Sequence, residues 1–233
     1  NDAPTANDET VSGDEDQVIT GSITANDLDG DALTFTVLFE GDFLSTVIDP
    51  VTGAFTITPN ANFNGTDTAN ILIDDGNGGT VTADIFVTIN PVNDAPIAND
   101  DTAATDQNTV VGANLISGGP GGDFDPDFNG LTLTEINGAA IVDGQTITLA
   151  SGALITVNTD GTYSYDPNAQ FDDLAGGGTP ETATDIITYT VSDGLLTDEG
   201  QLTVTISGLN DAPAAVADAV SAPEDDGAGT ENG

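Results

Sequence analysis

Apolar and polar residues alternate with a period of two along most of this chain, and no segment shows the 3.6-residue period of an amphipathic helix. Leu33, Phe35 and Val37, for example, alternate with Thr34 and Thr36. The same alternation recurs at residues 55–58, 85–89, 147–149, 155–157, 163–165, 187–191 and 202–206. Threonine on one face and β-branched or aromatic residues on the other are typical of half-buried antiparallel strands. The pattern therefore predicts an all-β protein.

Short turn sequences separate these segments. Asn-Gly, Asp-Gly and Asp-Pro pairs occur at residues 49–50, 64–65, 75–76, 137–138, 160–161 and 193–194. Each half of the chain then holds about six to eight short strands, which is typical of a Greek-key β-sandwich. We expect tandem sandwiches of this kind.

The tetrapeptide Asn-Asp-Ala-Pro marks the start of a repeating unit, because it occurs at residues 1–4, 93–96 and 210–213. This repeat predicts one sandwich domain over residues 1–92 and a second, with loop insertions, over residues 93–209. Residues 210–233 are then a linker and the short, truncated start of a third repeat. Each complete unit has the size of an ordinary domain.

The chain carries 40 carboxylates and no Lys, Arg or His, so its formal charge is −40 and the counter-charge must come from outside. Contacts to phosphate need Lys or Arg, which excludes nucleic acid and anionic membrane surfaces as partners. No apolar run approaches the ~20 residues of a membrane-spanning helix, so we expect no membrane insertion. Two explanations of the acidity stay open, a salt-adapted surface and cation binding. The excess of Asp (32) over Glu (8) favours cation binding, because short side chains in turns suit compact oxygen cages.

The best candidate metal-binding segments carry carboxylates at alternate positions just before a predicted strand. These are Asp27, Asp29 and Asp31 in the first unit and Asp123, Asp125 and Asp127 in the second. Alternate residues of an extended chain point the same way, so these carboxylates converge and need a cation between them. Oxygen ligands without nitrogen or sulfur select Ca²⁺. Neither segment fits an EF-hand, because Ala32 and Phe128 would occupy the position of its glycine.

Several segments, read in order, resemble the cadherin-like repeats of large bacterial surface adhesins, those of the VCBS type among them. The matching segments are residues 25–31, 48–53, 62–67, 75–76 and 92–96. The resemblance covers nearly the whole chain and implies sandwiches of the cadherin or immunoglobulin type. It also implies calcium at the junction of successive domains, held by an acid near the first strand, the Asn-Asp linker and an Asp-x-Asp pair of the next domain.

The resemblance assigns ligands to one complete junction and two half-sites. At the junction they are Glu15 or Asp16, Asn93, Asp94, Asp125 and Asp127. Asp27, Asp29 and Asp31 would face a preceding domain, together with Asn1 and Asp2, and Asp106, Asn210 and Asp211 would await a following one. Complementary half-sites predict head-to-tail self-assembly.

Two positions depart from the cadherin pattern. Pro91 stands where a cadherin has its first linker acid, and residues 60–63 lack the carboxylate of the Leu-Asp-Arg-Glu motif. Asp67 and Asp185 are candidate substitutes for that carboxylate. The departures leave open the number of ions at each junction.

These observations predict a calcium-rigidified, secreted spacer module on the bacterial cell surface, in an adhesin or filament that supports cell adhesion or biofilm formation. Its expected partners are calcium ions and neighbouring repeats of the same protein. The alternative is a calcium-dependent carbohydrate-binding module that binds glycans by stacking them on Tyr163, Tyr165 or Phe residues. We expect no enzyme, because the chain has no His and no carboxylate pair that stands out for glycoside hydrolysis.

Overall fold

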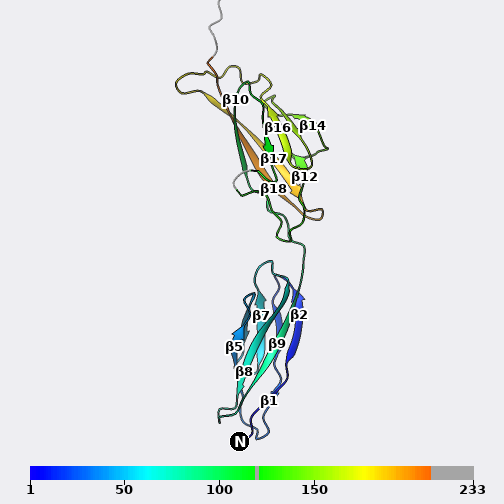
Figure 1. The fold of residues 1–233 in the computed structure, drawn as a ribbon, viewed down its shortest axis with the longest axis vertical. Coiled ribbons are helices and arrows are strands. Elements are labelled where there is room, and N and C mark those ends of the chain that lie inside the picture. The colour runs from blue at the N-terminus through cyan, green and yellow to red at the C-terminus, as the bar shows by residue number, and fades with distance from the viewer. Residues whose placement is uncertain (119–120, 211–233) are drawn as a thin grey trace, which may run out of the picture.

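The computed structural model describes residues 1–118 and 121–210, and every regular element in these residues is a β-strand. Two β-sandwiches follow one another end to end along the long axis, joined by an extended segment (Figure 1). Within the described residues, no helix is long and apolar enough to cross a membrane. The expected all-β fold class is confirmed.

The first sandwich contains strands β1 to β9. They are β1 (Thr5–Ala6), β2 (Glu9–Asp14), β3 (Ile19–Ser22), β4 (Ala25–Asn26), β5 (Thr34–Glu40), β6 (Leu44–Ile48), β7 (Ala54–Pro59), β8 (Gly65–Asp74) and β9 (Thr80–Asn90). One sheet has the order β2-β9-β8-β5 and the other β3-β7-β6, while β1 pairs with β4. The chain changes sheet between β2 and β3, between β3 and β5 (by way of β4), between β5 and β6, and between β7 and β8. These crossings give the expected Greek-key connections.

The second sandwich contains strands β10 to β18. They are β10 (Asp101–Asp106), β11 (Val111–Asn114), β12 (Thr132–Ile136), β13 (Ala139–Ala140), β14 (Gln145–Thr148), β15 (Leu154–Val157), β16 (Thr162–Asp166), β17 (Thr182–Ser192) and β18 (Thr197–Ser207). Its sheets have the orders β10-β18-β17-β12-β13 and β11-β16-β15-β14. In both sandwiches the first strand of the larger sheet runs parallel to the last one, β2 to β9 and β10 to β18.

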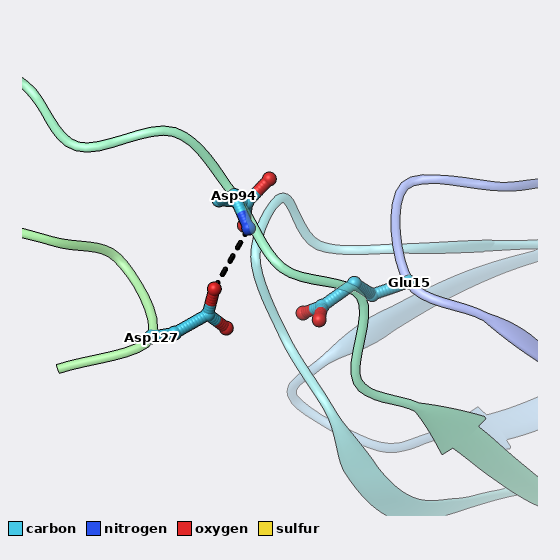
Figure 2. Close-up of side chains that lie close together, drawn as sticks. All are labelled: Glu15, Asp94 and Asp127. Carbon is cyan, nitrogen blue, oxygen red and sulfur yellow. Dashed lines mark hydrogen bonds between the residues drawn. The ribbon is translucent and has the colours of Figure 1, made fainter. Parts of the chain in front are cut away.

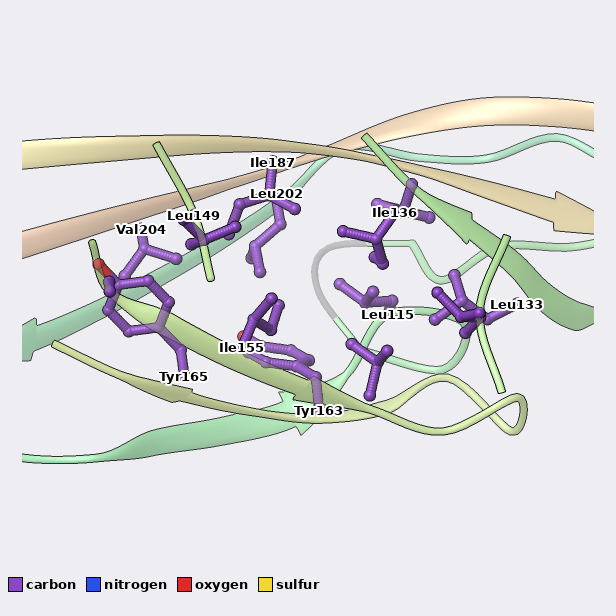
Figure 3. Packing of buried hydrophobic residues seen from close by; sticks show 14 of the residues in the cluster. Leu115, Leu133, Ile136, Leu149, Ile155, Tyr163, Tyr165, Ile187, Leu202 and Val204 are labelled. Carbon is purple, nitrogen blue, oxygen red and sulfur yellow. The ribbon is translucent and has the colours of Figure 1, made fainter. Parts of the chain in front are cut away.

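Each sandwich has its own hydrophobic core, built from the inward-facing residues of the alternating segments. Phe35, Ile57 and Ile71 are among the buried residues of the first core. Figure 3 shows the second core, in which residues of β15 and β16 pack against β17 and β18. The described residues place each core inside one sandwich, in agreement with two separate domains. The exact boundaries, at 92/93 and 209/210, stay a prediction.

Two tyrosines expected as sugar-stacking residues belong to the second core. Tyr163 and Tyr165 lie two apart on β16, so both point to the same face of the sheet, and they are 7% and 0% exposed. The Tyr165 hydroxyl donates to Oδ2 of Asp185 at 2.6 Å. The suggestion that these tyrosines bind glycans is therefore wrong, because their rings have no exposed face.

Candidate metal centre

Three carboxylates from both sandwiches meet at the junction between them. Glu15 belongs to the first sandwich, Asp94 to the linker and Asp127 to a loop of the second sandwich. One carboxylate oxygen of each lies within 4.8 Å of the others. Figure 2 shows the Glu15 side chain pointing from the first sandwich toward the other two. The sequence analysis places all three in one expected site.

The parallel pairing of β2 with β9 brings Glu15 to the junction. Asp14 is in register with Asn90, so Glu15 lies beside the first residues of the linker. Its N–H donates to the carbonyl of Asn90 (3.0 Å), and its Oε1 accepts the N–H of Val92 (2.6 Å). Glu15 is 2% exposed. Of the two expected acids, Glu15 therefore joins the group, whereas Asp16 accepts a backbone N–H of the loop after β7 (3.1 Å).

A short bridge brings the linker alongside the acidic loop of the second sandwich. Ile97 pairs with Phe124 in an isolated antiparallel bridge. The N–H of Asp94 then donates to Oδ2 of Asp127 at 2.7 Å. Oδ1 of Asp125 accepts the backbone N–H groups two and four residues further on, at 2.9 and 3.2 Å. These bonds fold the loop around Asp125, which is buried.

The junction carboxylates lack the partners that buried charges require. In the described residues, Oδ2 of Asp94 and Oδ2 of Asp125 are buried and accept no hydrogen bond. Burial is the main cause that raises the pKa of Asp94, and the charges of Asp16, Asp127 and Glu15 raise this pKa further. Two carboxylates 4.8 Å apart repel by about 3 kcal/mol at an effective dielectric near 20, and three such pairs approach the about 5–15 kcal/mol that keeps a domain folded. A cation offsets this repulsion, and an all-oxygen ligand set fits Ca²⁺.

A second carboxylate group lies at the opposite end of the first sandwich. One oxygen each of Asp27, Asp31 and Asp75 lies within 4.8 Å of the others. The pairing of Thr34 with Asp74 explains this, because it places the loop before β5 beside the turn after β8. Asp75 is 3% exposed, and its Oδ1 accepts two backbone N–H groups of its own turn at 2.7 and 2.9 Å. Oδ2 of Asp27 is another buried oxygen without a hydrogen bond in the described residues.

The same hydrogen bonds occur at this end of both sandwiches. In each, the Asn of the Asn-Asp pair donates its side-chain amide to a turn aspartate, and the following Asp donates its N–H to the loop. The equivalent pairs are Asn1–Asp75 (3.0 Å) and Asn93–Asp193 (2.6 Å), and Asp2–Asp29 (2.6 Å) and Asp94–Asp127 (2.7 Å). The two acidic loops are therefore equivalent, with Asp27 corresponding to Asp125 and Asp31 to Asn129.

Asp75 and Asp193 are not predicted as metal ligands from the sequence, because each is typical of an ordinary Asp-Gly turn. The hydrogen bond from Asn1 is the main cause that lowers the pKa of Asp75. The N–H of Leu196, followed by the amide of Asn93, lowers the pKa of Asp193. Their position relative to the strands is the signal that could have found them. Asp75 follows β8, which pairs with β5, the strand after the first acidic loop. Asp193 follows β17, which pairs with β12, the strand after the second acidic loop.

Asp106, a ligand expected for the C-terminal half-site, belongs to neither carboxylate group. Asp106 ends β10 and accepts the N–H of Asn108 (2.8 Å) and the hydroxyl of Thr109 (2.9 Å). Asn210 is exposed at the end of the described residues, and Asp211 lies outside them. The half-site itself stays a prediction.

Neither candidate substitute for the missing cadherin carboxylate joins the junction group. Asp67 accepts the N–H of Phe43 at 3.0 Å, within the first sandwich. Asp185 accepts the hydroxyls of Ser151 (2.7 Å) and Tyr165 (2.6 Å), within the second. Both carboxylates already have hydrogen-bond donors in their own sandwiches.

Comparison with known families identifies both halves of the chain. The profile of the bacterial cadherin-like domain matches residues 93–208, and that of the bacterial Ig domain matches residues 1–88. Domains of these families are typical of surface or extracellular proteins, and they are typically structural modules rather than enzymes. No curated protein sequence matches the chain significantly.

A solved cadherin structure, the desmocollin-1 ectodomain, shares the fold, and two further cadherin structures match with lower scores. The human desmocollin-1 ectodomain is 11% identical with a TM-score of 0.56, and the match covers 90% of this chain and 41% of that one. Drosophila N-cadherin EC1-4 is 17% identical (TM-score 0.45), with 90% of this chain and 50% of that chain covered. Human protocadherin-24 EC1-2 is 15% identical (TM-score 0.47), with 91% and 100% covered. This chain thus spans less than half of the desmocollin ectodomain and half of the N-cadherin fragment. The family profiles thus place residues 93–208 in the bacterial cadherin-like domain family and residues 1–88 in the bacterial Ig domain family, and the desmocollin-1 match shows a cadherin fold.

Proposed function

We propose that this chain is a calcium-rigidified spacer of a bacterial adhesin or surface filament. The observation that carries the proposal is the junction group, because Glu15 comes from one sandwich and Asp127 from the other. A single ion bound by both bodies restricts their relative motion. An array of such junctions forms a stiff rod that holds an adhesive tip away from the cell, in support of adhesion or biofilm formation.

The ion would be held by oxygen ligands only. At the junction, Glu15, Asp94 and Asp127 would supply carboxylates, and the unpartnered Oδ2 of Asp125 is a further ligand. At the other end of the first sandwich, residues 27, 31 and 75 would hold a second ion. The ion contributes positive charge and fixed geometry, and it performs no catalysis here.

The two groups predict different effects of calcium. The junction group spans two bodies, so its repulsion without calcium pushes the sandwiches apart. The group of Asp27, Asp31 and Asp75 lies within one sandwich, so its repulsion lowers that domain's free energy of unfolding. Extracellular modules bind Ca²⁺ at about 10⁻⁴–10⁻³ M, and an ion bound only by the native state raises stability by mass action.

The test compares the protein in millimolar calcium and in chelator at equal ionic strength. We expect calcium to convert a flexible pair of domains into one elongated shape in small-angle X-ray scattering, and to raise Tm in calorimetry. The double variant Asp125→Asn and Asp127→Asn should stay flexible in calcium while both sandwiches remain folded. Identical scattering and melting in calcium and chelator would refute the proposal. Full rescue by NaCl alone would instead support salt adaptation of the surface.

A further inference from the structure

A cleft of about 430 Å³ lies at the junction, beside the carboxylate group. Asn62 and Asn64 line it from the loop after β7 of the first sandwich. Pro126, Phe128 and Asn129 line it from the acidic loop of the second sandwich. Its volume falls in the range of small-ligand sites. Because both sandwiches contribute, the cleft exists in this form only while the junction is fixed.

Phe128 is the residue in the cleft that the fold does not explain. It is 95% exposed, and its φ of 62° lies in the left-handed region, where bulky residues are strained. The equivalent residue of the first sandwich is Gly30, with a φ of 82°, and a Cβ built there meets no atom within 4 Å. The loop therefore needs the left-handed conformation, which glycine provides without strain, and it makes no use of the phenyl ring. An exposed phenyl ring that lines a cleft is suited to contact a ligand.

The amides around Phe128 offer hydrogen bonds that the protein leaves unused. The side chain of Asn62 makes no hydrogen bond to any described residue. The amide of Asn64 donates to Glu15 at 3.5 Å and that of Asn129 donates to Asn93 at 3.4 Å, while their own Oδ1 atoms accept no bond from the described residues.

The loop that carries Asn62 and Asn64 is held in place by an aromatic pair. Phe63 stacks on Phe43 with 4.3 Å between ring centroids, and Asn62 has a φ of 57°. The amides are thus presented on a loop whose conformation is set before any ligand binds.

The charge and polarity of the cleft restrict the chemical class of ligand that it can bind. The chain has no basic residue, and Asp127 of the junction group lines the cleft, so an anionic ligand is repelled. A mainly apolar partner would use Phe128 but would leave the amides and Asp127 buried without partners. A neutral sugar matches both features, because a pyranose has an apolar C–H face for the ring and vicinal hydroxyls that pair with amide donors and acceptors.

We propose that this junction cleft binds a neutral carbohydrate, with one sugar ring stacked on Phe128 and its hydroxyls bonded to Asn62, Asn64 and Asn129. The inference rests on the proposed function in one respect, since a fixed junction holds the two walls of the cleft together. Binding is therefore stronger in calcium than in chelator. The tyrosines of the second core take no part in it.

The test uses the whole chain and five soluble probes: maltohexaose, cellohexaose, laminarihexaose, xylohexaose and mannohexaose. Saturation-transfer NMR and calorimetry should show at least one of them binding in calcium with a Kd of about 1 mM, typical of a shallow site with few contacts. Phe128→Gly, which restores the residue of the equivalent loop, should weaken binding at least about tenfold without lowering Tm. Asn62→Gly, which keeps the left-handed backbone accessible, should also weaken it.

The control is Phe86→Thr, which removes another exposed Phe (46% exposed) from β9, outside the cleft. It should bind the sugar as the wild type does. Failure of all five probes while scattering shows a rigid junction overturns this inference and leaves the spacer function standing. Equal binding of the sugar by the wild type and by Phe128→Gly also overturns the inference. The same holds if the only effect of Phe128→Gly is to dissociate a dimer of this chain. A junction that stays flexible in calcium refutes the spacer function instead.

Discussion

Replacing Glu15 by Gln should change the stiffness of the junction in opposite directions with and without calcium. Gln has the length of Glu, and its Oε1 can still accept the N–H of Val92, so the backbone geometry at the end of β2 is kept. The substitution removes the charge of the one first-sandwich carboxylate, Glu15, that lies within 4.8 Å of both Asp94 and Asp127 in the described residues. It is therefore a selective test of the charge.

The magnitude follows from the geometry of the group. Glu15 faces Asp94 and Asp127 with oxygens within 4.8 Å, so each pair repels by about 3 kcal/mol at an effective dielectric near 20 before salt screening. In chelator, Glu15→Gln removes both repulsions between the sandwiches, so the variant should be stiffer than the wild type. In calcium it loses a charged ligand, so calcium affinity at the junction should fall at least about tenfold, or 1.4 kcal/mol.

The assay is small-angle X-ray scattering with parallel calcium titration by calorimetry, at equal ionic strength. Glu9→Gln, at the start of the strand β2 that precedes Glu15 and outside both carboxylate groups, is the matched control and should behave as the wild type. A Glu15→Gln variant that is as rigid as the wild type in calcium and binds it equally well contradicts our assignment of Glu15 as a ligand. A variant no stiffer than the wild type in chelator contradicts the repulsion estimate.

Three further predictions concern single domains. Asp75→Asn should lower Tm by about 5 °C or more in calcium and by less in chelator, whereas Asp160→Asn, in a similar turn without a carboxylate group, should show no such dependence on calcium in scanning calorimetry. Tyr165→Phe should cost about 1.5–3 kcal/mol of unfolding free energy in urea titrations, because it removes a hydrogen bond to a carboxylate. Tyr163→Phe, whose hydroxyl bonds to no described residue, should cost less than about 1 kcal/mol. Burial raises the pKa of Asp101 from 3.8 to about 6, so between these pH values the native state binds a proton that the unfolded state has released. The stability that this proton contributes is fully present below about pH 4 and is lost as the pH rises through about 6. The unfolding free energy of the wild type, measured relative to that of Asp101→Asn, should therefore fall over this interval by up to about 3 kcal/mol; equal pH profiles would contradict the assignment.

The sequence predicts the metal ligands that come from the acidic loops better than those that come from other segments. Asp27 and Asp31, or Asp125 and Asp127, stand close together in the chain, and the alternation before a strand is enough to show that they converge. The resemblance to adhesin repeats adds the Asn-Asp linker and narrows the first-strand acid to two neighbours. The choice of Glu15 over Asp16 needs the register of β2 with β9, because that register decides which of the two side chains faces the linker.

Sequence by itself determined the all-β class, the repeat and the acid-rich ends, since period-two burial, turn residues and composition are local properties of the chain. Tertiary structure alone decided which distant residues meet. Asn1 and Asp75 are 74 residues apart, yet they are hydrogen-bonded, because β1 pairs with β4 and β5 pairs with β8. Likewise, the alternation at Tyr163 and Tyr165 fits either face of a sheet, and only the packing of the second sheet on the first buries them. Register and sheet packing join residues far apart in sequence, and a local pattern carries no information about either.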